Sequence, residues 1–109
     1  MIISGGANIY PAEIEGELIN HPAVQDVAVF GIPNDDWGEE IKAVVELHEG
    51  FEPGDELTGE IITWAGTRMG KFKLPRTIDY VDTLPREPNG KLIKRKLRDP
   101  YWEGIDRKI

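Results

Sequence analysis

The chain has 109 residues, of which 39% are hydrophobic and 30% charged, and its formal net charge is −7. This length predicts one domain with a modest core, and the absence of cysteine excludes disulfides and thiolate sites. No apolar run approaches the roughly 18 residues of a membrane span, and no signal peptide is visible at the N-terminus, so we expect a cytoplasmic protein.

The N-terminal half predicts a β-hairpin, a helix and two strands. Gly5-Gly6 separates two short extended pieces, and Pro11 suits the first position of a helix. The expected elements are the hairpin in Met1–Tyr10, a helix from Pro11 to His21-Pro22, strands over Val24–Gly31 and Ile41–Leu47, and a polar loop over Ile32–Glu39 between them.

The C-terminal half predicts a helix, a strand and a short basic helix. The expected elements are a helix opened by Pro53-Gly54-Asp55 and ended by Gly70, a strand over Arg76–Val81, a loop over Leu84–Gly90, and a helix over Leu92–Leu97 that Pro100 breaks. The whole order favours a small α+β domain with helices packed on a mostly antiparallel sheet.

Charge is divided unevenly along the chain. Residues 1–67 contain fourteen acidic residues and one basic residue, whereas residues 68–98 contain ten basic and three acidic residues. The overall acidity argues against nucleic acid as a partner, because it would oppose the phosphate backbone. The basic segment can face a small phosphate-bearing ligand or an acidic protein surface, or it can pair with the acidic half of the chain; charge alone leaves both open.

Familiar catalytic patterns are missing from the sequence. His21 and His48 are far apart and lie in no metal-ligand spacing. Ser4 lacks the glycine–x–Ser–x–glycine pattern of a nucleophile elbow, and Gly5-Gly6 lacks the glycine–lysine–Ser/Thr ending of a phosphate loop. We therefore expect neither a complete catalytic constellation nor a metal site within this chain.

Asn89-Gly90-Lys91 is the remaining candidate for chemistry. Asn-Gly adopts left-handed backbone angles at low cost, so the turn can present the lysine from a defined position. An ammonium group is a compact charge suited to phosphate or carboxylate oxygens. Such a turn is also common on protein surfaces without any function, but its basic neighbours raise the local positive potential.

Three blocks of the sequence resemble the C-terminal domain of acyl-CoA synthetases, which belong to the adenylate-forming (AMP-binding) enzymes. They are MIISGGANIYPAEIE at Met1–Glu15, HPAVQDVAVFGIPNDDWGEEIKAVV at His21–Val45, and KFKLPRTIDYVDTLPREPNGKLIKRKL at Lys71–Leu97. The last block resembles the family's closing block with its adenylation lysine. The resemblance covers residues 1–98, which we expect to form the mobile cap domain, and it leaves residues 99–109 as a tail.

The resemblance implies a two-step ligase. ATP adenylates a carboxylic acid, fatty or aromatic, with release of pyrophosphate, and CoA then takes the acyl group while AMP leaves. The missing N-terminal domain would bind ATP, Mg²⁺ and the acid, and the small domain would rotate between the two steps. We therefore expect the 109 residues to fold but not to catalyse alone.

The resemblance also implies roles for particular residues. Lys91 would enter the site for adenylation, and the loop with Gly5 and Gly6 would replace it for thioester formation, where glycines let the backbone approach the pantetheine arm. The positions of Trp37 and Phe72 match aromatic residues that meet CoA in some relatives, and Lys73 would add a phosphate contact.

This sequence departs from the family pattern in two places, which weakens the transfer of residue roles from the family. Two alternative functions also stay open. The family's hinge residue would precede Met1, and neither Asn8 nor Leu74 is the arginine that touches CoA phosphates in several relatives. The alternatives are a stand-alone binding module of the same fold without catalysis, and the adenylation subdomain of a peptide synthetase. The latter typically carries a lysine and an arginine near the glycine of its opening motif, which MIISGG lacks.

Overall fold

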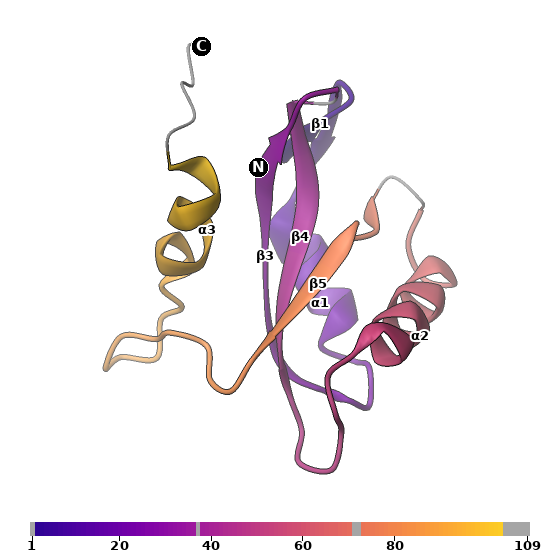
Figure 1. Ribbon diagram of the computed structural model, residues 1–109, viewed down its shortest axis with the longest axis vertical. Coiled ribbons are helices and arrows are strands. Elements are labelled where there is room, and N and C mark those ends of the chain that lie inside the picture. Colours follow the sequence, from indigo (N-terminus) through magenta and orange to yellow (C-terminus); the bar gives the residue numbers. More distant parts are fainter. Residues whose placement is uncertain (1, 37, 71–72, 104–109) are drawn as a thin grey trace.

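A computed structural model describes residues 2–36, 38–70 and 73–103 of the chain. These described residues form a five-stranded sheet and three helices (Figure 1). In chain order the elements are β1 (Ile2–Ser4), β2 (Ala7–Ile9), α1 (Pro11–Leu18), β3 (Val24–Asn34), β4 (Gly38–Leu47), α2 (Asp55–Gly66), β5 (Thr77–Val81) and α3 (Lys94–Trp102).

Strand β4 organises the sheet. It pairs antiparallel with β3 along ten registered positions, from Val24↔Leu47 to Asn34↔Gly38. On its other side it pairs antiparallel with β1 at Ser4↔Gly38 and parallel with β5 from Lys42↔Thr77 to Glu46↔Val81. The β1–β2 hairpin therefore extends one end of the sheet, and β3 forms an outer edge.

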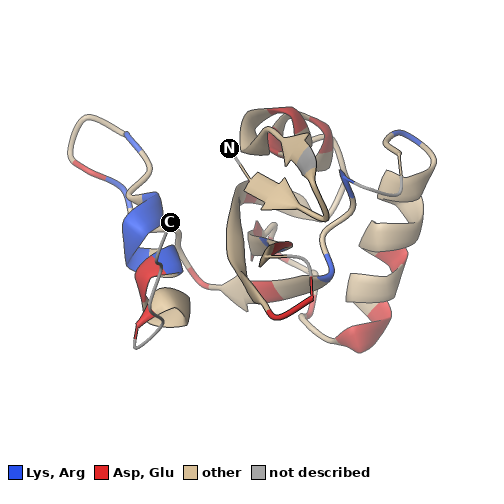
Figure 2. Cartoon of the chain, turned by 90° about the horizontal axis from the view of Figure 1, so that it is seen from above, with Lys and Arg blue, Asp and Glu red and all other residues tan. Residues whose placement is uncertain are grey.

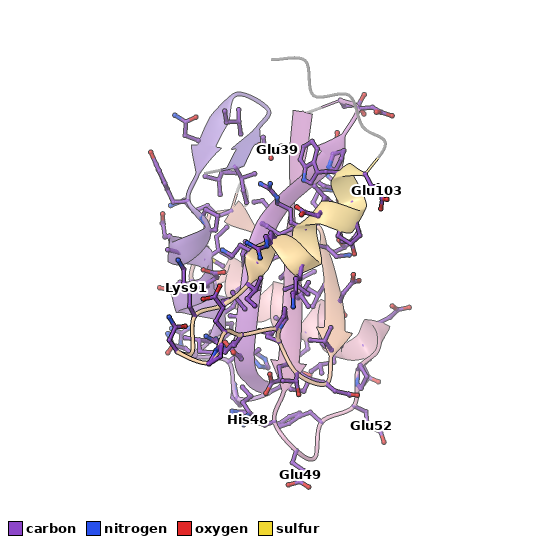
Figure 3. The ribbon with its side chains drawn as sticks, turned by 90° about the vertical axis from the view of Figure 1, so that its left-hand side faces the viewer. Glu39, His48, Glu49, Glu52, Lys91 and Glu103 are labelled. Atoms are coloured by element: carbon purple, nitrogen blue, oxygen red, sulfur yellow. The ribbon has the colours of Figure 1, made fainter. Side chains whose placement is uncertain are left out.

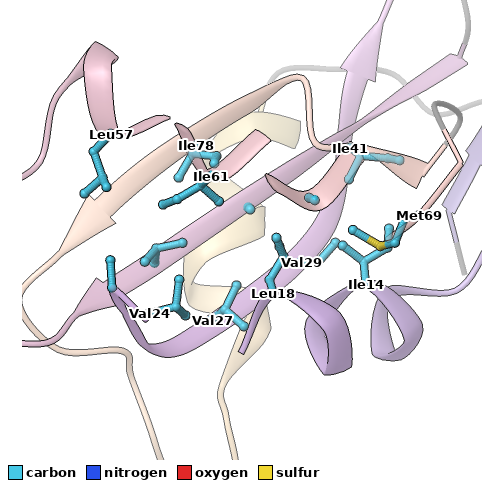
Figure 4. Packing of buried hydrophobic residues seen from close by; sticks show 14 of the residues in the cluster. Ile14, Leu18, Val24, Val27, Val29, Ile41, Leu57, Ile61, Met69 and Ile78 are labelled. Carbon is cyan, nitrogen blue, oxygen red and sulfur yellow. The ribbon is translucent and has the colours of Figure 1, made fainter. Parts of the chain in front are cut away.

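The main core lies on one face of the sheet, under α1 and α2. Ile14 and Leu18 of α1 and Ile61 of α2 are fully buried there (Figure 4). Residues at alternate positions of β3, such as Val27 and Val29, point into the same core, because successive side chains of a strand face opposite sides of the sheet.

A second, smaller cluster lies on the opposite face, under α3. Its buried members are Ala28, Phe30, Val44 and Leu84, and half-buried side chains that include Leu92, Leu97 and Tyr101 pack against them. Figure 1 shows the result: α3 lies on one side of the sheet and the other two helices lie on the other.

The predicted fold class is confirmed, with an N-terminal hairpin and a mostly antiparallel sheet flanked by helices. The loop predicted over Ile32–Glu39 is wrong at both ends, because the β3–β4 ladder continues to Asn34↔Gly38 and leaves a tight connection. Pro33 is tolerated because β3 is an edge strand.

The predicted end of the last helix is also wrong. Pro100 lies inside α3, which runs to Trp102, so the expected start of a tail at residue 99 falls within the helix. An interior proline costs roughly 3 kcal/mol. Contacts of Tyr101 and Trp102 with the sheet hold the turn beyond it.

Candidate functional site

Lys91 lies at the end of a closed turn that precedes α3 (Figure 3). The Gly90 amide donates to the Glu87 carbonyl at 2.8 Å, and the Glu87 amide donates to the Lys91 carbonyl at 2.8 Å. Asn89 Oδ1 accepts the Lys91 amide at 3.0 Å. Gly90 has φ +87°, a left-handed conformation that glycine adopts without strain. The predicted Asn-Gly turn is confirmed, and it presents an exposed lysine side chain.

The internal pairing expected for the basic segment is confirmed for four of its residues. Arg68, Lys73, Arg86 and Lys94 form ion pairs with Glu17, Glu13, Asp26 and Glu15, all in the acidic half of the chain. No ion pair within the described ranges involves Lys91, Arg95 or Lys96, which are exposed. Figure 2 shows Lys and Arg positions gathered on α3 and in the loop before it, on the other side of the sheet from α1 and α2. The unpaired lysine of the turn is therefore available to an anionic partner.

The glycine hairpin forms a second exposed feature. Gly5 has φ +59° and Gly6 has φ +85°, and a Cβ at either position would meet no atom within 4 Å. Backbone conformation rather than space therefore favours glycine in this turn. The hairpin lies apart from the Lys91 turn in Figures 1 and 3, so the structure does not bring these candidates into one site.

The other predicted site residues are only partly described. Lys73 is described, and its Nζ bonds Glu13 at the start of α1. Trp37 and Phe72 lie outside the described residues. In the described part of the chain, no group of three or more His, Asp or Glu side chains is placed to hold a metal ion, and no helix has the length and apolar character of a membrane span.

A polar cluster that the sequence analysis missed fixes the end of α3 to the sheet. Lys42 Nζ lies 2.8 Å from Asp79 Oδ1, and the Tyr101 hydroxyl donates to Asp79 Oδ2 at 2.5 Å. Lys42 Nζ also lies 5.3 Å from the centre of the Tyr101 ring. We call Lys42, Asp79 and Tyr101 the α3 latch. The sequence signal that could have indicated it was a lone lysine within an apolar strand, which needs a partner when buried.

The latch shifts two pKa values. Burial raises the pKa of Asp79, but the hydrogen bonds from Lys42 and Tyr101 outweigh it, so this pKa lies below its usual range. Burial, together with the hydrogen bond to Asp79, raises the pKa of the Tyr101 hydroxyl. At neutral pH Asp79 is therefore ionised and Tyr101 is a neutral donor, which is the arrangement that the latch requires.

Known proteins with the same sequence pattern are acid ligases. Residues 13–91 match the model of the family described as AMP-binding enzyme C-terminal domain. A feruloyl-CoA synthase from an Amycolatopsis species is 46% identical over 99 residues, which are 90% of this chain and 19% of the relative. A fatty acid–[acyl-carrier-protein] ligase from Streptomyces coeruleorubidus is 38% identical over 108 residues, covering 99% of this chain and 20% of that relative.

The fold agrees with that of solved structures. The crystal structure of an acyl-CoA synthetase from Brucella canis matches with a TM-score of 0.89 and 38% identity, over 93% of this chain and 19% of that chain. The present chain thus spans about one fifth of the length of these relatives. It belongs to the AMP-binding enzyme C-terminal domain family.

Proposed function

We propose that the chain is the mobile C-terminal domain of an acyl-CoA synthetase, which activates a fatty or aromatic acid with ATP and passes the acyl group to CoA, releasing pyrophosphate and AMP. The observation that carries the proposal is Lys91, an exposed ammonium on a hydrogen-bonded turn in a chain of this family. A stand-alone binding module is not favoured, because it has no need of this lysine and the relatives are acid ligases.

Lys91 would act by charge and position. Its ammonium has three donors and no acceptor, so it can bridge the acid's carboxylate and the phosphate oxygens of ATP. Negative charge develops on these oxygens as the phosphoryl centre is attacked, and a fixed cation stabilises that charge. Mg²⁺ is expected through the N-terminal domain, since the described residues hold no suitable group of carboxylates.

The glycine hairpin would serve the second step. Gly5 and Gly6 carry no side chain and hold left-handed angles, so the backbone can approach the pantetheine arm of CoA. Trp37, Phe72 and Lys73 stay candidates for CoA contacts, and Lys73 would have to exchange Glu13 for a phosphate group to serve as one.

The relatives differ in the acceptor that their names give. One relative transfers a fatty acid to an acyl carrier protein. The opening sequence MIISGG follows the CoA-ligase version of the motif, so CoA is our proposal and a carrier protein is the alternative. Both acceptors present a thiol on a pantetheine arm, so the two are separated by experiment rather than by the hairpin. The cytoplasmic location stays a prediction.

The test uses the full-length enzyme that contains this domain. We expect Lys91→Ala to lower acid-dependent ATP–pyrophosphate exchange by about two orders of magnitude, the size of effect found for single transition-state donors. Thioester formation from a premade acyl-adenylate should persist, and supplying CoA or a carrier protein in that assay identifies the acceptor. Lys96→Ala, which removes an exposed charge from α3, is the matched control.

Two results would contradict the proposal. Unchanged pyrophosphate exchange in Lys91→Ala would remove this lysine from the chemistry and favour the binding module. Thioester formed by the 109 residues alone from ATP, acid and CoA would contradict the assignment of the acid and ATP sites to the N-terminal domain.

A further inference from the structure

The segment that carries Lys91 lies against the open edge of the sheet. Strand β3 is the outer strand beside β4, so alternate backbone groups on its free side have no partner strand. Three of these groups are nevertheless hydrogen-bonded. The Val27 amide donates to Asp26 Oδ1 at 2.9 Å, the Val29 amide donates to Glu15 Oε2 at 2.8 Å, and the Gly31 carbonyl accepts Trp102 Nε1 at 2.9 Å.

Each of the two carboxylates at this edge, Asp26 and Glu15, also contacts a basic side chain. Asp26 Oδ2 accepts Nε and Nη2 of Arg86 at 3.0 and 2.5 Å. Glu15 Oε2 lies 2.9 Å from Lys94 Nζ. Each carboxylate therefore joins the backbone of β3 to one basic side chain of the segment before or within α3.

The two basic residues bracket Lys91. Arg86 precedes it by five residues and Lys94 follows it by three. Arg86 Nη1 also donates to the Gly90 carbonyl at 2.6 Å, so the same guanidinium bonds the sheet edge and the turn. An isolated antiparallel β-bridge between Arg86 and Leu92 closes the loop that carries Lys91. We call Asp26–Arg86 and Glu15–Lys94 the edge clamp.

The arrangement exceeds what edge protection alone requires. Asp26 and Glu15 would satisfy the edge amides without any cation, and the cations could remain solvated. Exposed single ion pairs contribute little to stability, but the Asp26 and Glu15 side chains are only 23% and 22% exposed. Arg86 also makes charge-assisted bonds in a fixed fork geometry, which restricts direction as well as distance. One ion pair before Lys91 in the sequence and one after it fix the position of its turn better than either ion pair alone.

We propose that Asp26 and Glu15 are positioning residues for Lys91, holding its turn at the orientation that adenylation requires. This inference rests on the proposed function. Neither carboxylate touches a substrate, and both act through Arg86 and Lys94. A misplacement of the lysine by about 1 Å lowers the rate of adenylation, because charge stabilisation depends on geometry.

The experiment compares isosteric variants of the full-length enzyme. Asp26→Asn and Glu15→Gln keep an oxygen for the Val27 and Val29 amides but remove the charge that holds the cation. We expect each to lower ATP–pyrophosphate exchange about three- to tenfold, and the double variant at least about tenfold, with thioester formation from premade acyl-adenylate unchanged. Glu17→Gln is the matched control, since Glu17 lies on α1 and pairs with Arg68, outside the clamp.

A second readout reports the clamp without any chemistry. Amide hydrogen exchange of Gly90 and Lys91, both bonded within the turn, should accelerate in the double variant and not in Glu17→Gln. Equal losses in both half-reactions would reveal a general structural role and overturn the proposal, as would unchanged pyrophosphate exchange or unchanged hydrogen exchange. Lys91→Ala is measured alongside: if it is impaired while the clamp variants are not, the clamp proposal fails and the proposed function stands. An unimpaired Lys91→Ala means that both fail.

Discussion

The two faces of the sheet are held to their helices by different chemistry. Under α1 and α2, sixteen of the described residues form a cluster of buried apolar side chains, which includes Leu18 and Ile61 at 0% exposure. Under α3 the buried apolar cluster has four members, and α3 itself contributes no buried residue. On this side, the ion pairs and hydrogen bonds of the Lys42–Asp79–Tyr101 latch and of the edge clamp add directional contacts between the α3 segment and the rest of the fold.

The comparison separates stability from positioning. Apolar burial is nondirectional and scales with area, so the α1 and α2 face supplies most of the folding free energy. Hydrogen bonds and ion pairs contribute less net energy but fix direction. Directional contacts therefore orient the basic segment with Lys91 on the sheet. Because this segment buries little apolar surface, we expect it to be the least stable part of the described fold.

The largest effect should come from truncating the main core. Leu18→Ala removes three heavy atoms (Cγ, Cδ1 and Cδ2) from a fully buried site and should lower the free energy of unfolding by about 2–5 kcal/mol. Leu97→Ala, at a half-buried site on α3, should cost about 1 kcal/mol. Urea unfolding of the 109-residue chain, followed by far-ultraviolet circular dichroism, compares the two. Equal costs would contradict the distinction between the faces.

A smaller effect should follow from breaking the latch. Lys42 is 6% exposed, so Asp79→Ala leaves a buried ammonium without its carboxylate and also removes the acceptor of the Tyr101 hydroxyl. Breaking a fully buried pair costs about 3–5 kcal/mol. Because the Asp79 side chain is 47% exposed, we expect a loss of about 1–3 kcal/mol.

A double-mutant cycle identifies the cause of that loss. Lys42→Met combined with Asp79→Ala removes both charges and should recover part of the free energy of unfolding lost in Asp79→Ala alone. Strictly additive losses would show that Lys42 does not depend on Asp79. The measurement is again urea unfolding of the same chain.

Most of the fold could be predicted because local signals and global packing agree. Gly5-Gly6 marks the hairpin turn, Pro11 the start of α1, and alternating or continuous apolar residues mark β3 and β4. The secondary-structure predictions were wrong where tertiary contacts outweigh the local preference of the sequence. Pro100 is a strong helix breaker, but the bonds of Tyr101 and Trp102 to the sheet keep α3 intact around it.

The candidate site was only partly predictable. Asn89 and Gly90 indicate the turn directly, because their backbone preferences are local. The partners that hold the turn are not local: Asp26 and Arg86 are 60 residues apart, and the sequence shows each of them only as one charge among many. Charge counts predict that acidic and basic segments attract, but which pairs form depends on the sheet register.

The smallest effect is a pH dependence confined to the latch. The pKa of Asp79 is lowered in the folded chain relative to the unfolded value of about 3.9, so the unfolded state binds more protons on acidification. The contribution of Asp79 is therefore fully present above about pH 5 and is lost as the pH falls through the folded pKa, below about 3.9. Because the carboxylate is half-exposed and screened, we expect a change of about 0.5 kcal/mol. The difference in the free energy of unfolding between the unmodified chain and Asp79→Asn should shrink as the pH falls from about 5 to about 3. Asp82→Asn, at an exposed position on the same segment, controls for the general loss of carboxylate charge. A difference that stays constant with pH would mean that Asp79 holds α3 by hydrogen-bond geometry alone, and the comparison of the two faces would then rest on directionality without charge.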